Sequence, residues 1–159
     1  MTNTEATANR VRQIPAVDLS RTPSMLGRID YVDAFEVDVR RPGDCGAEEW
    51  MRTILEGAPL SMRARLLSAW SAIGLKLRLP GSDRSILGWD IRAGDDDFVL
   101  LGAPSRIGMP GELLLRRKEG GLLFQTFVRH DNSIVRALWA RIEASHVKTV
   151  RSLLARVCG

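Results

Sequence analysis

The longest regular pattern of apolar and polar residues lies in the last 28 residues, from Asn132 to Gly159. The polar stretch 130–133 can cap a first helical turn, and neither Pro nor Gly follows before Gly159. At about 1.5 Å per residue, this helix would run on the order of 37 Å. One helical face collects Val135, Leu138, Trp139, Ile142, Val150, Leu153 and Val157. The pattern therefore predicts one long amphipathic terminal helix, with His146 in the middle of its apolar face.

The first regular element is predicted between residues 29 and 39, where apolar residues alternate with acidic ones. This period of two is typical of a half-buried strand. Asp33 is the exception, because the alternation places its carboxylate on the apolar face. Two short helices are predicted next, one capped by Asp44 and reaching Leu55, and one from about Leu60 to Ile73.

The stretch 75–129 predicts strands joined by Gly- and Asp-rich turns. Strands are expected at 75–79, 87–92, 98–101, 105–117 and 122–129. Gly108, Pro110 and Gly111 predict a bulge or a bend in the middle of the fourth of these strands. In the last strand Thr126 shares a face with three apolar residues. Strands linked by hairpins make an antiparallel sheet, and the terminal helix has the length and the apolar stripe to cover it. The expected class is α+β, with two short helices after the first strand.

Residues 1–28 contain Pro15 and Pro23 and few large apolar side chains, which predicts a flexible or loosely docked lead. Residues 29–159 are expected to form a single domain. The polar start does not resemble a signal peptide, and no apolar run approaches a membrane span. We therefore expect a cytoplasmic protein without a membrane-spanning segment.

Composition excludes several classes of function. The net charge is +4, but the basic residues are scattered and are not interleaved with aromatic residues, so no nucleic-acid partner is expected. Cys45 and Cys158 lack metal-ligand spacing and are expected to be unpaired. The acidic run 95–97 lacks the Gly and the distant Glu of a calcium loop, and indicates a solvated turn. We expect no metal site and no cofactor.

Two residues are candidates for acid/base chemistry. His146 would face apolar walls, where an imidazole can act as a donor, a general base or a structural hydrogen-bonding group. A buried Asp33 carboxylate would need a partner such as an Arg, an indole N–H or His146, unless a strand end or a bulge exposes it. If the two meet, they form an acid/base pair.

A ligand cavity is the other possibility. Trp50, Trp70, Trp89 and Trp139 all fall on apolar faces, where they can line a cavity or simply fill the core. Thr126 can add a hydroxyl group or merely suit a strand. The residues expected to contact a ligand are Trp139, His146, Trp89, Trp70, Thr126, Phe35 and Ile142.

The order of elements resembles the helix-grip fold of the START, polyketide-cyclase and birch-pollen-allergen superfamily. Within it, the chain resembles a group of small actinobacterial proteins of unknown function. The closer likeness rests on Gly74-Leu75, Ile86-Leu87-Gly88-Trp89, Thr126, Leu138-Trp139 and His146. The resemblance implies a curved antiparallel sheet around the terminal helix, enclosing an elongated cavity for an apolar ligand such as a lipid, a sterol or a polyketide. Some members are enzymes, but their catalytic residues differ between subfamilies, so none can be transferred here.

The leading hypothesis is a binding module that holds a small apolar or amphipathic molecule between sheet and terminal helix. The first alternative is a cyclase- or hydrolase-like enzyme that uses His146 and Asp33 as acid and base. The second is a structural or protein-interaction domain with a closed core. The pattern leaves the ligand and the oligomeric state open.

Overall fold

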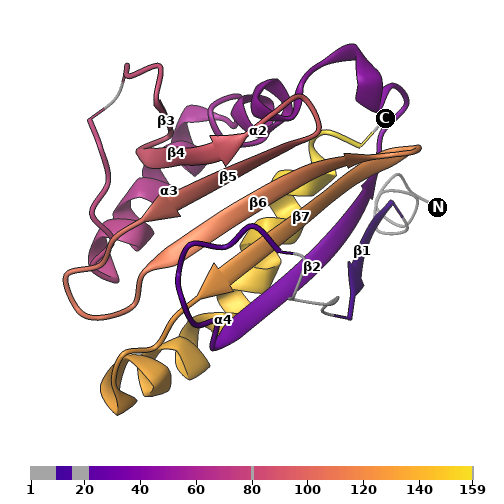
Figure 1. Ribbon diagram of the computed structural model, residues 1–159. Helices are drawn as coiled ribbons and strands as arrows, with labels where there is room; N and C mark the ends of the chain where they lie inside the picture. The colour runs from indigo at the N-terminus through magenta and orange to yellow at the C-terminus, as the bar shows by residue number, and fades with distance from the viewer. Residues whose placement is uncertain (1–9, 16–21, 80, 159) are drawn as a thin grey trace.

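The computed structural model describes residues 10–15, 22–79 and 81–158. Seven strands form one antiparallel, curved sheet in the order β1-β2-β7-β6-β5-β4-β3 (Figure 1). The strands are β1 (Val11–Ile14), β2 (Tyr31–Asp38), β3 (Ser85–Ile86), β4 (Trp89–Gly94), β5 (Phe98–Ala103), β6 (Gly111–Lys118) and β7 (Gly121–Val128). The helices are the short 3-10 helix η2 (Pro42–Asp44), α2 (Ala47–Leu55), α3 (Leu60–Ala72) and α4 (Ser133–Ala155). The α+β class, the antiparallel sheet and the terminal helix are confirmed.

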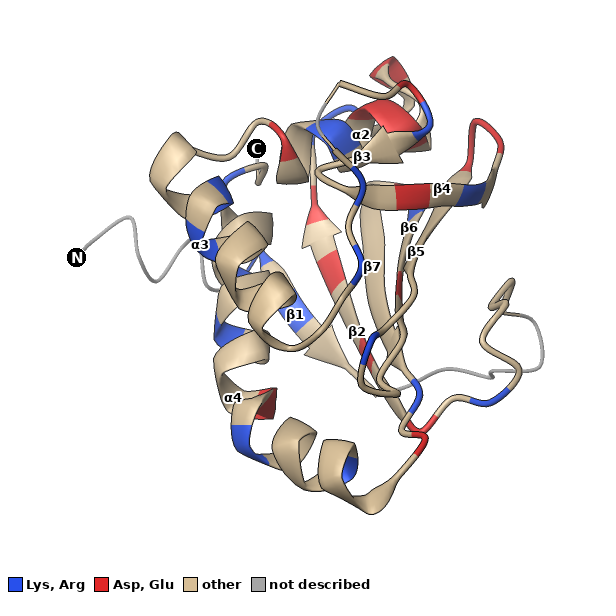
Figure 2. Cartoon of the chain, turned by 90° about the vertical axis from the view of Figure 1, so that its left-hand side faces the viewer, with Lys and Arg blue, Asp and Glu red and all other residues tan. Residues whose placement is uncertain are grey.

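The two faces of the sheet are covered differently. Figure 2 shows α3 and α4 on one side of the sheet, which we call the inner face. Alternate residues of the central strands, such as Phe35, Leu115 and Phe124, pack there with Val150, Leu153 and Leu154 of α4. The intervening residues, such as Leu114 and Phe127, form a smaller cluster on the outer face. The period of two in the strands therefore sorts side chains between two cores.

Helix α4 covers the inner face with an apolar stripe close to the predicted one. Its fully buried residues include Val135, Trp139 and Leu153. The Asn132 side chain caps the helix by accepting a hydrogen bond from the Val135 N–H at 3.0 Å. Leu154 was not assigned to the stripe but is 0% exposed. No helix in the described ranges is long and apolar enough to cross a bilayer.

Two local predictions were wrong, and a third is confirmed in part. Residues 75–79 form no strand, and only Leu75 makes an isolated bridge, to Ser105. Leu87 and Gly88 both have positive φ, so they form a two-residue hairpin turn and β4 begins only at Trp89. The chain does bend at residues 106–108, where Gly108 has positive φ, but this bend precedes β6 and does not interrupt a longer strand. A register shift of the kind a bulge makes lies in β4, between Ile91 and Ala93.

The two predicted short helices, α2 and α3, follow β2, the strand predicted between residues 29 and 39. However, β2 is not the first strand of the chain, because the lead contributes an additional strand, β1, which pairs with β2 through Val11↔Val37 and its neighbours. The apolar residues of this four-residue strand are too few to give a readable alternation, so the sequence pattern did not predict it. The rest of the lead that falls on residues 1–9 and 16–21 lies outside the described residues.

Residues 22–30 close the outer face through a buried carboxylate. Glu112 of β6 is 0% exposed and accepts hydrogen bonds from the Ser24 hydroxyl and, at 2.9 Å, from the Met25 N–H. The Arg92 guanidinium lies 3.5 Å from the same carboxylate. Leu26 then packs into the outer cluster. The buried Glu112 carboxylate therefore helps to anchor the end of the lead to the sheet, together with Arg129, which donates a hydrogen bond to the Leu26 carbonyl at 2.7 Å.

We expect Glu112→Gln to lower the free energy of unfolding by about 2–3 kcal/mol. The substitution removes the negative charge that pairs with Arg92 and that accepts hydrogen bonds from the Ser24 hydroxyl and the Met25 N–H. Urea unfolding of the full chain measures this change. The matched control is Glu119→Gln, an exposed turn residue, which should shift stability by less than about 0.5 kcal/mol. Equal effects of the two substitutions would contradict the anchoring role of Glu112.

Candidate functional site

A partly open pocket lies between α3, α4 and the inner face of the sheet. We call it the inner pocket, and its volume is about 50 Å³. Five of the seven residues expected to contact a ligand line it, namely Trp70, Trp89, Thr126, Trp139 and His146. The remaining lining residues are Ile73, Leu75, Met109, Gly111, Leu113 and Val128. The pocket is therefore mostly apolar, with a few polar atoms in its wall.

The pocket is built by residues of five elements, namely α3, β4, β6, β7 and α4. Trp139 and His146 lie on one stripe of α4, about two turns apart. Thr126 comes from β7, and Trp89 from the start of β4. The Trp89 indole fits against Gly111, where an added Cβ would lie only 3.3 Å from its Cη2 atom. Gly111 thus makes room for the large ring that forms one wall.

Asp33 and His146 meet at the edge of this pocket. His146 Nε2 lies 2.8 Å from Asp33 Oδ2, and the Tyr31 hydroxyl donates to the same oxygen at 2.8 Å. The Asp33 side chain is 1% exposed and that of His146 is 19% exposed. Asp33 is also the direct cross-strand partner of Thr126 on β7. The structure therefore brings both acid/base candidates to one place.

The hydrogen bonds to Asp33 indicate which atoms of Tyr31 and His146 carry a proton. Burial, together with the neighbouring Asp33 carboxylate, raises the pKa of Tyr31 well above its ordinary value, so its hydroxyl stays protonated and donates. With the Asp33 carboxylate ionised, His146 Nε2 must carry the proton that bonds it. The Nδ1 atom of a neutral His146 is then the nitrogen with a free lone pair.

Four buried polar atoms around the pocket lack a partner within the described part of the chain. They are Trp89 Nε1, Trp139 Nε1, Thr126 Oγ1 and Asp33 Oδ1. Nearly all buried polar atoms in folded proteins are hydrogen-bonded, so a group of four at one place is unusual. Three of these atoms belong to residues that line the pocket, and the fourth belongs to Asp33, the partner of the lining residue His146.

A second depression, which we call the side groove, runs along the flank of α4. It has a volume of about 420 Å³ and is lined by Asp30, Tyr31, His130, Arg136, Trp139, Ala140 and Glu143. Trp139 lines both the side groove and the inner pocket. Its ring packs against Tyr31 at a centroid distance of 4.8 Å and against His146 at 5.1 Å. The Trp139 ring therefore forms a wall between the two spaces.

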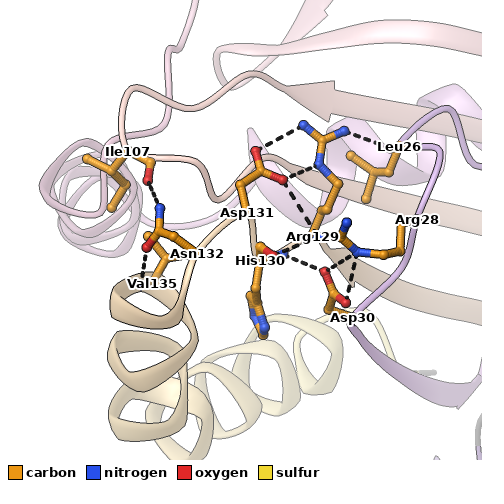
Figure 3. Close-up of polar contacts among 9 residues, drawn as sticks. All are labelled: Leu26, Arg28, Asp30, Ile107, Arg129, His130, Asp131, Asn132 and Val135. Carbon is orange, nitrogen blue, oxygen red and sulfur yellow. Dashed lines mark hydrogen bonds and ion pairs between the residues drawn. The ribbon is translucent and has the colours of Figure 1, made fainter.

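Ion pairs hold the junction where β7 leads into α4, as Figure 3 shows. Asp30 accepts a hydrogen bond from the His130 backbone N–H at 2.7 Å and pairs with Arg28 at 3.0 Å. Arg129 pairs with Asp131 at 2.7 Å. The His130 imidazole points away from these pairs, and its Nε2 is buried without a partner in the described residues. This junction fixes the start of α4 and hence the position of Trp139.

The other predicted site residues lie elsewhere. Phe35 is fully buried in the core of the inner face, with the Arg151 guanidinium 5.4 Å from its ring centroid. Ile142 packs against a cluster that contains Val135 and Trp139 and does not line the inner pocket. Trp50 also lies outside the lining and donates its indole N–H to the Pro42 carbonyl at 2.9 Å.

Sequence reasoning missed Tyr31 and Met109. Tyr31 had a readable signal, because it precedes Asp33 by two residues on the same strand face. Met109 had none, since it was assigned to a strand but lies in the loop before β6. Both cysteines are free thiols, as expected. Asp95 accepts hydrogen bonds from the N–H groups of Asp97 and Phe98, which confirms a turn there.

Among the described residues no group of three or more His, Cys, Asp or Glu side chains is placed to hold a metal ion. Comparison of the chain with protein-family models, with curated proteins and with solved structures finds no match.

We expect the buried His130 to make stability depend on pH. Burial lowers the pKa of His130 below its ordinary value; Asp30 opposes this shift, and Arg136 and Arg28 add to it. Below about pH 6.5 the unfolded chain takes up a proton at this residue that the folded chain resists, so stability falls as the pH falls. Urea unfolding at pH 8 and pH 5.5 should show a smaller loss for His130→Gln than for the unchanged protein. An identical loss in both would contradict the role of His130.

Proposed function

We propose that this protein is a binding module for a small amphipathic molecule held in the inner pocket. The observation that carries the proposal is the set of four buried polar atoms that have no partner among the described residues and that belong to, or lie beside, the lining of a mostly apolar cavity. Leaving one such atom unpaired in a protein interior costs on the order of 1–3 kcal/mol. A ligand with a polar head and an apolar body satisfies these atoms and also fills the cavity.

The size of the pocket sets the scale of the ligand. Its volume of about 50 Å³ is several times the roughly 10–15 Å³ that one water molecule needs, but is small for a lipid or a sterol. The inner pocket therefore receives a small molecule, or one end of a larger one. A larger ligand would extend past Trp139 into the side groove, which has a volume of about 420 Å³.

We further propose that the fold is a helix grip of the START and polyketide-cyclase kind, in which the sheet wraps around α4. The support is the packing of Val150, Leu153 and Leu154 against the inner face. The resemblance carried by Trp89, Thr126, Trp139 and His146 adds to it, because all four of these residues line the inner pocket. A cavity between sheet and terminal helix is what that superfamily would lead us to expect.

A thermal-shift screen of small amphipathic molecules tests the proposal, and we expect some to raise the melting temperature. Ile73→Phe should weaken the binding of any hit at least fivefold, because the larger ring enters the inner pocket. The matched control is Ile91→Phe, also half-buried but outside this lining, which should leave affinity within twofold. The proposal would be overturned if no molecule in the screen bound, or if the molecules that bind had the same affinity for the Ile73→Phe variant as for the unchanged protein.

A second candidate function is acid/base catalysis, which the 2.8 Å contact of His146 and Asp33 favours. Asp33 would hold the imidazole with Nε2 protonated, leaving Nδ1 to accept a proton from water or a substrate. Tyr31 would hold the carboxylate in place through its own hydrogen bond. The reaction class would be hydrolysis or another proton transfer at a small polar group.

If this second function operates, His146→Gln should reduce hydrolysis of a small neutral ester such as ethyl acetate by roughly 10²-fold or more, as loss of a general base does. Release of acid in a pH-stat measures the rate. His130→Gln is the control, because His130 is the second of the two histidines in the chain and does not contact Asp33. Unchanged turnover in His146→Gln would eliminate the catalytic role and leave the binding role standing.

A protein-interaction role has less support. The exposed large apolar side chains among the described residues, Met25, Leu60, Leu79, Ile107 and Ile134, belong to five different segments. Scattered apolar side chains of this kind are ordinary on a protein surface.

A further inference from the structure

We infer that the ligand of the inner pocket presents a neutral carbonyl oxygen, as a ketone, an ester or an amide does, to the indole N–H groups of Trp89 and Trp139. This inference rests on the proposed binding function and names the chemical class of its ligand. It follows from the kinds of polar atom in the pocket wall, the charge beside them and the space they enclose.

The two tryptophans require an acceptor. An indole N–H can donate a hydrogen bond but cannot accept one. Trp89 Nε1 and Trp139 Nε1 are both buried and unpaired within the described residues, and both side chains line the same cavity of about 50 Å³. A carbonyl oxygen has two lone pairs and therefore has the capacity to accept hydrogen bonds from two donors. The Thr126 hydroxyl, which also lines the cavity, can adapt as a further donor or acceptor.

The charge at the pocket wall excludes an anion as that acceptor. The Asp33 carboxylate is 1% exposed, and its partner His146 is part of the lining. The lining contains neither Lys nor Arg. A carboxylate or phosphate would therefore be buried near the Asp33 carboxylate without a Lys or Arg in the lining to pair with it, which is unfavourable. A neutral carbonyl oxygen accepts the same hydrogen bonds without that cost.

The apolar residues of the lining determine the chemical character of the rest of the ligand. Ile73, Leu75, Met109, Leu113 and Val128 offer only apolar contacts. The carbonyl group must therefore sit on a compact hydrocarbon, such as a short chain or a small ring.

Three probes of similar size separate the possibilities, with affinity measured by isothermal titration calorimetry on the full chain. Cyclopentanone carries the carbonyl, methylenecyclopentane has the same shape with a methylene group in place of oxygen, and cyclobutanecarboxylate carries the negative charge. We expect cyclopentanone to bind at least fivefold more tightly than either of the others.

Substitutions of the tryptophans then test whether their N–H groups donate to the carbonyl oxygen of the ligand. Trp89→Phe and Trp139→Phe each keep an aromatic ring but remove the donor, so each should weaken cyclopentanone binding roughly five- to tenfold and leave methylenecyclopentane within twofold. Trp50→Phe is the matched control, because its N–H is already bonded to the Pro42 carbonyl away from the lining. Trp50→Phe should change the affinity for neither cyclopentanone nor methylenecyclopentane. Circular dichroism verifies that each variant is folded.

Each outcome has a distinct meaning. Equal or tighter binding of methylenecyclopentane would overturn the carbonyl inference and leave the proposed binding function intact. Tightest binding of cyclobutanecarboxylate would overturn the requirement for a neutral group. Binding of none of the three would overturn the inference together with the proposed function. If a tryptophan variant does not fold, the comparison of the three probes on the unchanged protein decides the matter.

Discussion

The burial of one carboxylate governs how the terminal helix lies on the sheet. Asp33 sits on the inner face of β2 at 3% exposure, where an unpaired charge would be costly. Tyr31 on its own strand supplies one hydrogen bond, and His146 of α4 supplies the other contact. Because a helix residue must reach Asp33, the rotation and the axial position of α4 are restricted. The placement of Trp139, and with it the shape of the inner pocket, depends on the same contact.

The outer face repeats this arrangement with other partners. Glu112 is as deeply buried as Asp33, but it is held by Arg92 and by backbone and side-chain donors of residues 24 and 25. Each face of the sheet thus has a buried carboxylate in contact with a segment that covers it. Removing one partner of such a buried contact is costly, because the other partner is left without compensation. The two carboxylates differ in how far they are hydrogen-bonded: donors reach both oxygens of Glu112, whereas one oxygen of Asp33 has no partner among the described residues.

Much of this arrangement could be read from the sequence, and the remainder could not for definite reasons. The period of two around Asp33 and the helical period around His146 placed both residues on inward faces, but their contact depends on how α4 crosses β2, which no local pattern encodes. Strand β1 has only four residues, too few for a readable alternation. Leu87 was assigned to a strand by its apolar character, whereas the adjacent Gly88 allows a tight turn that outweighs this preference. The size of the pocket follows from side-chain packing across five elements, and could not be predicted from residue spacing alone.

The order of the strands has a further consequence for how the protein behaves in concentrated solution. The sheet ends on both sides in its two shortest strands, β1 with four residues and β3 with two. An edge strand exposes backbone N–H and C=O groups that can pair with another chain, and the hazard grows with its length. The eight-residue strand β2 would be a long, exposed template if β1 did not lie along it. The short strand from the lead therefore protects the sheet against association edge to edge, a role distinct from any contribution it makes to the core.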